Sequence, residues 1–406
     1  MKKFLVFLLC IGLIFSGISV SAGSAKQVAS EYLTDDINTP LAVETAAPAK
    51  IGDTVPINAK SAILLEPYTG EILYEKNADE RLSPASITKI MGLLLVMEEI
   101  EKGNLKLTDV ITVSEHAAGM GGSQIWLEPG ERMSVDDLLK AAVIASANDA
   151  MAALGEAVAG SEETFVQKMN QKAKELGLNN TNFVNCTGLD AENHYSSAHD
   201  IAVMAGELIK HEQIKKYSTV WMDTLRGGKT ELVNTNKLVR FYDGCTGLKT
   251  GTTSTAGCCL AATAKRQNME LVAVVMKADN TNERFLAARK LLDLGFANYS
   301  FCSIGADISD SLSLKVTAGE SEQVKIDAGE ELKLLLKKGD NSRIIKKIIL
   351  PESVKAPVKK SDILGSVSVL LDNNEIGTIE LKAASDVKKI NFATTFLWLI
   401  CALIEL

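Results

Sequence analysis

The order of apolar and polar residues predicts a β-hairpin followed by a series of helices. Two short apolar runs, 62–65 and 71–74, flank the turn-forming sequence Pro67-Tyr68-Thr69-Gly70, which is the pattern of two paired strands. After Pro84 the apolar residues recur with a helical period. The ranges with this period are 90–100, two stretches within 135–159, then 163–176 and 198–209.

Strands return in the second half of the chain. The apolar runs 260–264 and 271–276 predict two adjacent strands. The run 283–294 predicts one more helix, with Arg284 and Arg289 on its polar side. Strands, a block of helices, and then strands with a final helix indicate an α+β domain with an antiparallel sheet.

Beyond about residue 300 the segments become short and alternating, with Gly, Asp and Asn turns between them. These segments are 312–316, 323–326, 331–336, 344–350, 367–371 and 375–381. Short alternating strands with turn residues between them predict a small all-β domain over residues 300–385.

The beginning of the chain predicts export. A basic pair at residues 2–3 precedes an apolar run, 4–15, and small residues that end at Ala22. This is the organisation of a secretory signal peptide, which we expect at 1–22. Residues 23–50 are rich in small and polar residues without periodicity and predict a flexible spacer.

The end of the chain predicts a membrane-anchoring helix within residues 386–406. Lys388 and Lys389 precede the run 390–404, which is apolar on every side. A core helix of the β domain is the alternative. A spanning helix would place the lysine pair outside, against the usual charge bias, so the pattern favours shallow insertion. We therefore expect the protein on the outer, cell-wall side of the cytoplasmic membrane.

Composition narrows the function only slightly. The formal net charge of −8 argues against a general nucleic-acid binder, which needs a basic face. The cysteines beyond the signal peptide are irregularly spaced, which suggests neither a zinc site nor a disulfide framework. They are Cys186, Cys245, Cys258, Cys259, Cys302 and Cys401. Cys258 and Cys259 lie in an apolar strand-like run and are expected in the core.

The first candidate for chemistry is Ser86-Ile87-Thr88-Lys89 at the start of a predicted helix. A hydroxyl and an amine at positions i and i+3 face the same side of a helix. A serine hydroxyl needs a base before it can attack, and a lysine can be that base when burial or a nearby cation lowers its pKa. Alone the pattern is weak, because a capping serine followed by a solvated lysine is common.

Two further motifs follow in the chain. Ser146-Ala147-Asn148 lies between two predicted helices and can project a hydroxyl and an amide into a cleft. Lys249-Thr250-Gly251 comes just before a predicted strand, where glycine lets a substrate backbone approach a sheet edge. A helix–helix corner and a glycine-rich turn are the ordinary interpretations, but the three motifs in this order favour a common site.

In this order the motifs resemble the signature of the penicillin-recognising serine enzymes, and most closely that of the low-molecular-mass D-alanyl-D-alanine carboxypeptidases. The resemblance covers about 51–299, and the β domain and terminal helix also fit the family's architecture. Further stretches that resemble the family are 82–89, 145–150, 182–189, 194–200 and 291–296.

The resemblance implies a serine peptidase that acts on peptidoglycan stem peptides ending in D-Ala-D-Ala. Ser86 would attack the carbonyl between the two D-alanines, and Lys89 would accept its proton. Ser146 and Lys249 would help return a proton to the departing D-alanine. Lys249 would also help keep Lys89 neutral.

The same resemblance implies the substrate contacts. Asn148 would bind the acyl-side amide, and Thr250 with the Lys249 ammonium would hold the terminal carboxylate, beside Gly251. The oxyanion hole would be the backbone N–H of the nucleophile and of Thr252, where many relatives carry His or Tyr. No metal or organic cofactor is implied, and β-lactams are expected as covalent inhibitors.

Several rival functions were weighed. A Ser-His-Asp triad built on His199 and Asp200 lacks a Gly-x-Ser-x-Gly elbow, so His194 and His199 are expected to shape a loop or pack locally. A class A β-lactamase needs a Glu-x-x-Leu-Asn segment, which Glu162-Glu163 and the residues after them do not match. A transpeptidase or an endopeptidase on the same fold stays open. A non-enzymatic wall-binding module is disfavoured because every motif is intact.

Overall fold

A computed structural model describes residues 56–309 and 311–391. The predicted signal peptide at 1–22, the predicted spacer at 23–50 and most of the predicted anchor, residues 392–406, lie outside the described residues. Among the residues that are described, no helix combines the length and the apolar character needed to cross a membrane.

The part of the chain up to residue 298 mixes helices and strands. Its elements are β1 (Ser61–Glu66), β2 (Glu71–Lys76), η1 (Ala85–Thr88), α2 (Lys89–Glu101), β3 (Val110–Thr112), α3 (Glu115–Ala118), β4 (Arg132–Ser134), α4 (Val135–Ile144), α5 (Asn148–Ala159), α6 (Glu162–Glu175), α7 (Ala198–Lys210), α8 (Glu212–Ser218), β5 (Met222–Leu225), η2 (Arg226–Gly228), β6 (Thr230–Val233), α9 (Leu238–Phe241), β7 (Cys245–Thr253), β8 (Gly257–Arg266), β9 (Met269–Ala278) and α10 (Thr281–Asn298).

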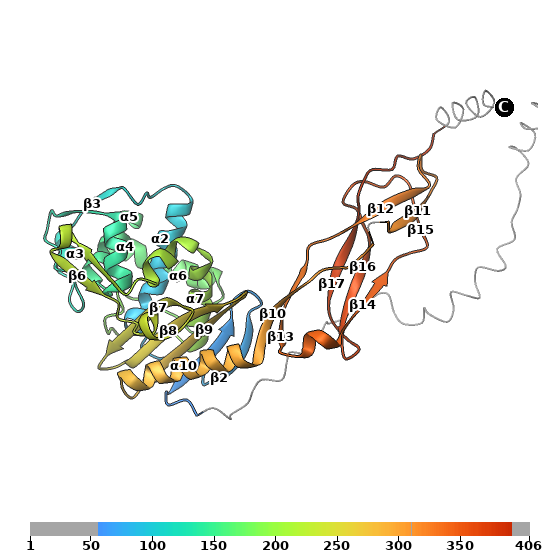
Figure 1. The fold of residues 1–406 in the computed structure, drawn as a ribbon. Helices are drawn as coiled ribbons and strands as arrows, with labels where there is room; N and C mark the ends of the chain where they lie inside the picture. Colours follow the sequence, from blue (N-terminus) through green and yellow to red (C-terminus); the bar gives the residue numbers. More distant parts are fainter. Residues whose placement is uncertain (1–55, 310, 392–406) are drawn as a thin grey trace, which may run out of the picture. The chain divides into compact units, whose positions relative to one another are not determined.

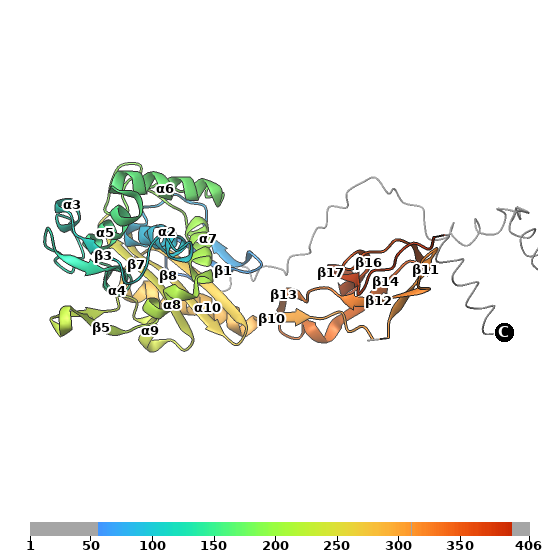
Figure 2. The same cartoon turned by 90° about the horizontal axis from the view of Figure 1, so that it is seen from above.

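A five-stranded sheet in the order β2-β1-β9-β8-β7 forms the centre of this region, and all its pairings are antiparallel. The helix α10 covers one face and the helical block containing α2, α5 and α7 covers the other (Figures 1 and 2). Alternate residues of β1 show why both faces are covered. Ile63 packs into the core shared with the helical block, whereas Leu64 packs into the core shared with α10.

The strand β7 differs from the prediction. Lys249-Thr250-Gly251 was expected just before a strand, but it lies inside β7, where Lys249 pairs with Ala261 and Thr250 pairs with Leu260 of β8. The two glycines and the lysine of β7 have low strand propensity, and pairing with the long apolar strand β8 overrides it. Because β7 is an outer strand of the sheet, the predicted sheet-edge position of the motif is confirmed.

The C-terminal part is all β, as predicted. Its elements are β10 (Tyr299–Ile304), β11 (Ser313–Thr317), β12 (Gln323–Ala328), β13 (Leu332–Lys337), η3 (Asp340–Arg343), β14 (Ile344–Ile349), β15 (Ser353–Lys355), β16 (Ile363–Leu371) and β17 (Asn374–Ala383). A six-stranded sheet in the order β14-β16-β17-β12-β11-β15 carries its core, which includes Val367, Ile379 and Leu381. Isolated bridges at Val387 and Lys389 continue this pairing past residue 385.

Candidate active site

The turn η1 and the first residue of α2 bring Ser86 and Lys89 together. The amine of Lys89 donates a hydrogen bond of 3.0 Å to Ser86 Oγ. Ser86 is partly exposed, whereas Lys89 is fully buried at the start of α2. The partly exposed hydroxyl of Ser86 is therefore hydrogen-bonded to an amine, that of Lys89, which is shielded from water.

The surroundings of Lys89 Nζ supply neutral acceptors. Besides Ser86, the amine donates to Asn148 Oδ1 at 2.5 Å and to the carbonyl of Thr187 at 2.8 Å. Burial lowers the pKa of Lys89 to about 7, and the more weakly acting Cys186 and Asp149 oppose this shift. An amine with this pKa is substantially unprotonated at neutral pH, as a general base must be.

A second hydroxyl–amine pair comes from the α4–α5 corner and the strand β7. Lys249 Nζ donates to Ser146 Oγ at 2.7 Å and to its neighbour's carbonyl, Thr250 O, at 3.1 Å. Ser146 holds its hydroxyl there with a left-handed backbone, φ 62°. Burial lowers the pKa of Lys249 as well, and the charges of Lys89 and Arg284 add to the effect. Two buried amines close to each other disfavour two positive charges.

The amide of Asn148 links Lys89 to the loop around Gly121. Its Oδ1 accepts from Lys89, and its Nδ2 donates to the carbonyl of Gly121 at 2.6 Å. The backbone N–H of Asn148 donates to Ser123 O at 2.7 Å, which fixes the same loop. An amide oxygen accepts two hydrogen bonds and an amide nitrogen donates two, so each end can still bind one substrate group.

The motif residues Thr250, Gly251 and Thr252 form hydrogen bonds with neighbouring parts of the fold. Thr250 Oγ1 donates to Thr235 Oγ1 at 2.7 Å. Arg284 Nη1 donates to Thr252 Oγ1 at 2.8 Å and to the carbonyl of Gly251 at 3.2 Å. The prediction of Arg284 on the polar side of its helix is therefore wrong, since only 7% of it is exposed. A helical period cannot distinguish a solvated arginine from one that donates to the carbonyls of a neighbouring strand.

Two glycines allow the chain to close around the nucleophile. A Cβ atom on Gly251 would lie 2.8 Å from Pro84 O and 3.0 Å from Ser86 N. A Cβ atom on Gly188 would lie 1.8 Å from Ala85 O. Any other residue at either position would force β7 or the loop around Gly188 away from η1.

The contribution of Thr187 was missed by sequence reasoning. Asn185 shapes its loop, since Asn185 Oδ1 accepts from the backbone N–H groups of Thr187 at 3.2 Å and of Gly188 at 2.7 Å. The stretch 182–189 was recognised as similar to the family. A functional backbone carbonyl, however, has no side-chain signature by which the sequence could reveal it.

The histidines occupy local structural positions, as expected. His199 Nδ1 lies 3.4 Å from Asp200 Oδ1, and Asp200 also accepts from Thr181 and from the backbone of Asn180. His194 bonds to Thr88 and to the backbone of Val184. In the described residues these contacts join loops and helix ends, and they build no Ser-His-Asp triad.

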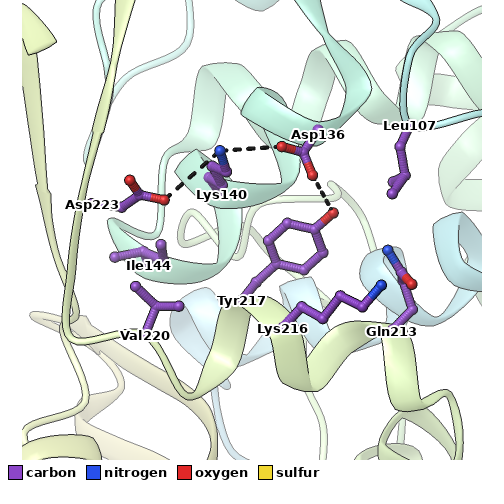
Figure 3. Close-up of a pocket in the computed structure, with 9 residues that line it drawn as sticks. All are labelled: Leu107, Asp136, Lys140, Ile144, Gln213, Lys216, Tyr217, Val220 and Asp223. Atoms are coloured by element: carbon purple, nitrogen blue, oxygen red, sulfur yellow. Dashed lines mark hydrogen bonds and ion pairs between the residues drawn. The ribbon is translucent and has the colours of Figure 1, made fainter. Parts of the chain in front are cut away.

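A separate cavity of about 210 Å³ lies between α4 and α8. Figure 3 shows that its charged groups are largely paired with one another. Tyr217 donates to Asp136 at 2.7 Å, and Lys140 lies 3.1 Å from Asp136 and 3.8 Å from Asp223. None of the motif residues lines it, so it is distinct from the Ser86 site.

Models of two protein families match the chain. The model described as D-alanyl-D-alanine carboxypeptidase matches residues 44–280. The model described as penicillin-binding protein 5, C-terminal domain, matches residues 304–389.

Individual proteins are also similar. The chain is 46% identical over 340 residues to D-alanyl-D-alanine carboxypeptidase DacF of Bacillus subtilis. The aligned region covers 83% of this chain and 87% of that protein. The chain is 34% identical over 328 residues to carboxypeptidase DacC of Escherichia coli, covering 79% and 82%. The crystal structure of penicillin-binding protein 5 from Haemophilus influenzae superposes with a TM-score of 0.72 at 32% identity, covering 83% of this chain and all of that one.

Proposed function

The chain belongs to the D-alanyl-D-alanine carboxypeptidase family, and on that premise we propose how its own residues carry out the reaction. The activity is that of a serine-type D-alanyl-D-alanine carboxypeptidase, which removes the terminal D-alanine from peptidoglycan stem peptides through an acyl-enzyme. The observation that carries the residue assignment is the buried Lys89 amine, 3.0 Å from the partly exposed Ser86 hydroxyl.

In the first step Ser86 Oγ attacks the carbonyl carbon between the two D-alanines. Its proton passes to Lys89 Nζ, for which the pKa of about 7 is well matched. Negative charge develops on the substrate oxygen. We assign its stabilisation to the backbone N–H groups of Ser86 and Thr252, which lie on η1 and β7. The strand and the turn approach each other closely at Gly251, where a Cβ atom would lie 3.0 Å from Ser86 N.

In the second step the bond between the carbonyl carbon and the leaving nitrogen breaks. The leaving D-alanine needs a proton, and the hydroxyl of Ser146 is the group proposed to deliver it. The 2.7 Å hydrogen bond from Lys249 Nζ orients that hydroxyl and can replace its proton. Water then attacks the ester carbonyl and gives up a proton through Ser146 to Lys249, while Lys89 returns its proton to Ser86 Oγ as the ester bond breaks. The shortened peptide leaves, and the free enzyme is restored.

Substrate binding is assigned to the groups around this centre. Asn148 has one free hydrogen-bonding position at each end of its amide and would bind the acyl-side peptide bond. Thr250 and Lys249, beside Gly251 on the outer strand β7, would hold the terminal carboxylate. The negative charge of that carboxylate raises the pKa of Lys249 again and so favours its ammonium form on binding.

The arrangement of the whole chain supports an extracytoplasmic enzyme. We propose the signal peptide at 1–22, the spacer at 23–50, the catalytic domain at 51–299, the all-β domain at 300–385 and the membrane anchor within 386–406. The composition of the terminal runs supports the first and last of these. An enzyme so tethered would meet peptidoglycan precursors at the outer face of the cytoplasmic membrane, and β-lactams would acylate the same serine.

The test is the release of D-alanine from a pentapeptide that ends in D-Ala-D-Ala. We expect the Ser86→Ala variant to release none above background and to lose labelling by a fluorescent penicillin. The Ser161→Ala variant is the control, because that serine caps the start of α6 and should leave both signals unchanged. Release by Ser86→Ala at the wild-type rate would exclude the proposed nucleophile, and rapid turnover of nitrocefin would instead indicate a β-lactamase.

A further inference from the structure

His194 lies between the turn that carries the nucleophile and the loop that faces Lys89. Only 5% of its surface is exposed. Its Nε2 lies 2.8 Å from the hydroxyl of Thr88, and its Nδ1 lies 3.0 Å from the backbone nitrogen of Val184. The ring also makes a T-shaped contact with Phe183, with 5.9 Å between the ring centres.

These contacts determine where the imidazole carries its proton. A backbone N–H can only donate, so Nδ1 must accept from Val184 and Nε2 must hold the proton. His194 therefore donates to Thr88 Oγ1. Burial lowers the pKa of His194 to about 4, although the charge of Asp190 acts in the opposite direction. The ring is thus neutral near pH 7, and both its hydrogen bonds are retained.

The two partners of His194 belong to the two sides that hold Lys89. Thr88 is the residue directly before Lys89 in the Ser86-Ile87-Thr88-Lys89 motif. Val184 begins the segment that ends in Thr187, whose carbonyl accepts from Lys89 Nζ at 2.8 Å. The buried ring of His194 therefore joins the turn that carries Ser86 to the loop in which the Thr187 carbonyl accepts a hydrogen bond from Lys89.

We propose that His194 is a positioning residue for acylation, which fixes the Thr187 carbonyl relative to the Ser86 turn and so directs Lys89 Nζ onto Ser86 Oγ. It touches neither substrate nor the reacting atoms, and it acts through Thr88 and Val184. The proposal rests on the assignment of Lys89 as the base. Its characteristic effect is on the chemical step, because the groups assigned to substrate binding lie elsewhere, on β7 and α5.

The experiment uses the full chain and steady-state release of D-alanine from the pentapeptide. In His194→Asn the side-chain oxygen can still accept from Val184 but is too short to reach Thr88. In Thr88→Val the same bond is lost from the other side with the shape of the residue retained. We expect kcat to fall roughly ten- to a hundredfold in each variant, the size of effect expected when a reacting group is displaced, with KM changed by less than about twofold.

A double variant and a conservative variant separate positioning from simple destabilisation. Because His194→Asn and Thr88→Val remove the same bond, their combination should reduce kcat no further than either change alone. Thr88→Ser keeps the hydroxyl and should restore kcat to within about twofold of the wild type. Thermal melting of each variant verifies that the assays are made on folded protein.

Three results would overturn the proposal: a wild-type kcat in folded His194→Asn, losses that multiply in the double variant, or a rise in KM with constant kcat. Ser86→Ala, assayed in parallel, distinguishes this failure from failure of the proposed function. If Ser86→Ala is inactive and His194→Asn is fully active, only the role of His194 is refuted. If Ser86→Ala is active, the assignment of the whole site fails.

Discussion

The catalytic region and the C-terminal β domain bury their polar groups very differently. In residues 56–298, charged and polar side chains such as Lys89, Asp149 and Lys249 are 0–1% exposed. Among the described residues of the β domain, Ser368 is the one buried polar side chain, and charged pairs such as Lys382 with Glu380 lie at the surface. Both regions nevertheless have apolar cores, with one cluster on each face of the sheet in the catalytic region and one cluster in the β domain.

The difference lies in whether each region buries charged side chains despite the free-energy cost. Removing an amine from water costs free energy that an apolar side chain of the same size does not cost. The described residues of the β domain avoid that cost, because their charged side chains stay at least partly in contact with water. The catalytic region accepts that cost at Lys89 and Lys249, and the lowered pKa of Lys89 is the property that its proposed role as the base requires.

The largest expected effect comes from replacing the buried amine by an apolar side chain. In Lys89→Met we expect kcat for D-alanine release to fall about 10³-fold, because the proposed general base is lost. The unfolding free energy should change by no more than about 1 kcal/mol, since the cost of burying the amine disappears along with its hydrogen bonds. Kinetics and urea unfolding of the same preparation measure both. If the variant fails to fold, the amine serves stability and the contrast between the regions disappears.

In the β domain we expect a substitution to change stability and to leave activity unchanged. Leu381 is fully buried in the centre of its sheet, so Leu381→Ala should destabilise this domain by about 2–5 kcal/mol. The D-alanine release rate should stay at the wild-type value below the melting transition. Lys382→Gln, the next residue on the same strand, is the matched control and should change neither property. Calorimetry of the full chain tests stability, and a loss of activity in Leu381→Ala would show that the two regions are coupled.

The smallest effect concerns pH. Lys89 must be unprotonated to accept a proton, and its pKa is about 7. The rate of acylation by a fluorescent penicillin should therefore rise with pH, reach half its maximum near pH 7, and fall about tenfold for each unit below that. A rate that is constant between pH 5.5 and 8 would show that Lys89 is already neutral at the lower value or is not the base.

Sequence predicted the framework of this molecule better than its interior contacts. The helices after Pro84 and the strands of the β domain follow from apolar periodicity. The short strand pairs β3–β4 and β5–β6 were missed because strands of three or four residues contain too few apolar positions to show a period. The interior of β7 was misjudged because its pairing with β8 overrides its own propensity.

The candidate site, too, was predicted in part from the sequence and in part not. The motif residues were found from their order, and the structure brings Ser86 and Lys89 together, and Ser146 and Lys249. The contributions of Thr187 and Arg284 could not be predicted, because each depends on contacts between segments distant in the chain. Such contacts leave no local pattern, whereas a serine and a lysine one turn apart do.

The backbone of Ser146 bears on how this enzyme could evolve. A serine at φ 62° occupies a region that glycine enters more readily, so a glycine would relieve strain at the α4–α5 corner. It would also remove the hydroxyl that Lys249 orients. If Ser146 delivers the proton as proposed, stability favours glycine at this position and the rate of D-alanine release favours serine. The position therefore marks a trade-off between robustness and rate, set by one torsion angle.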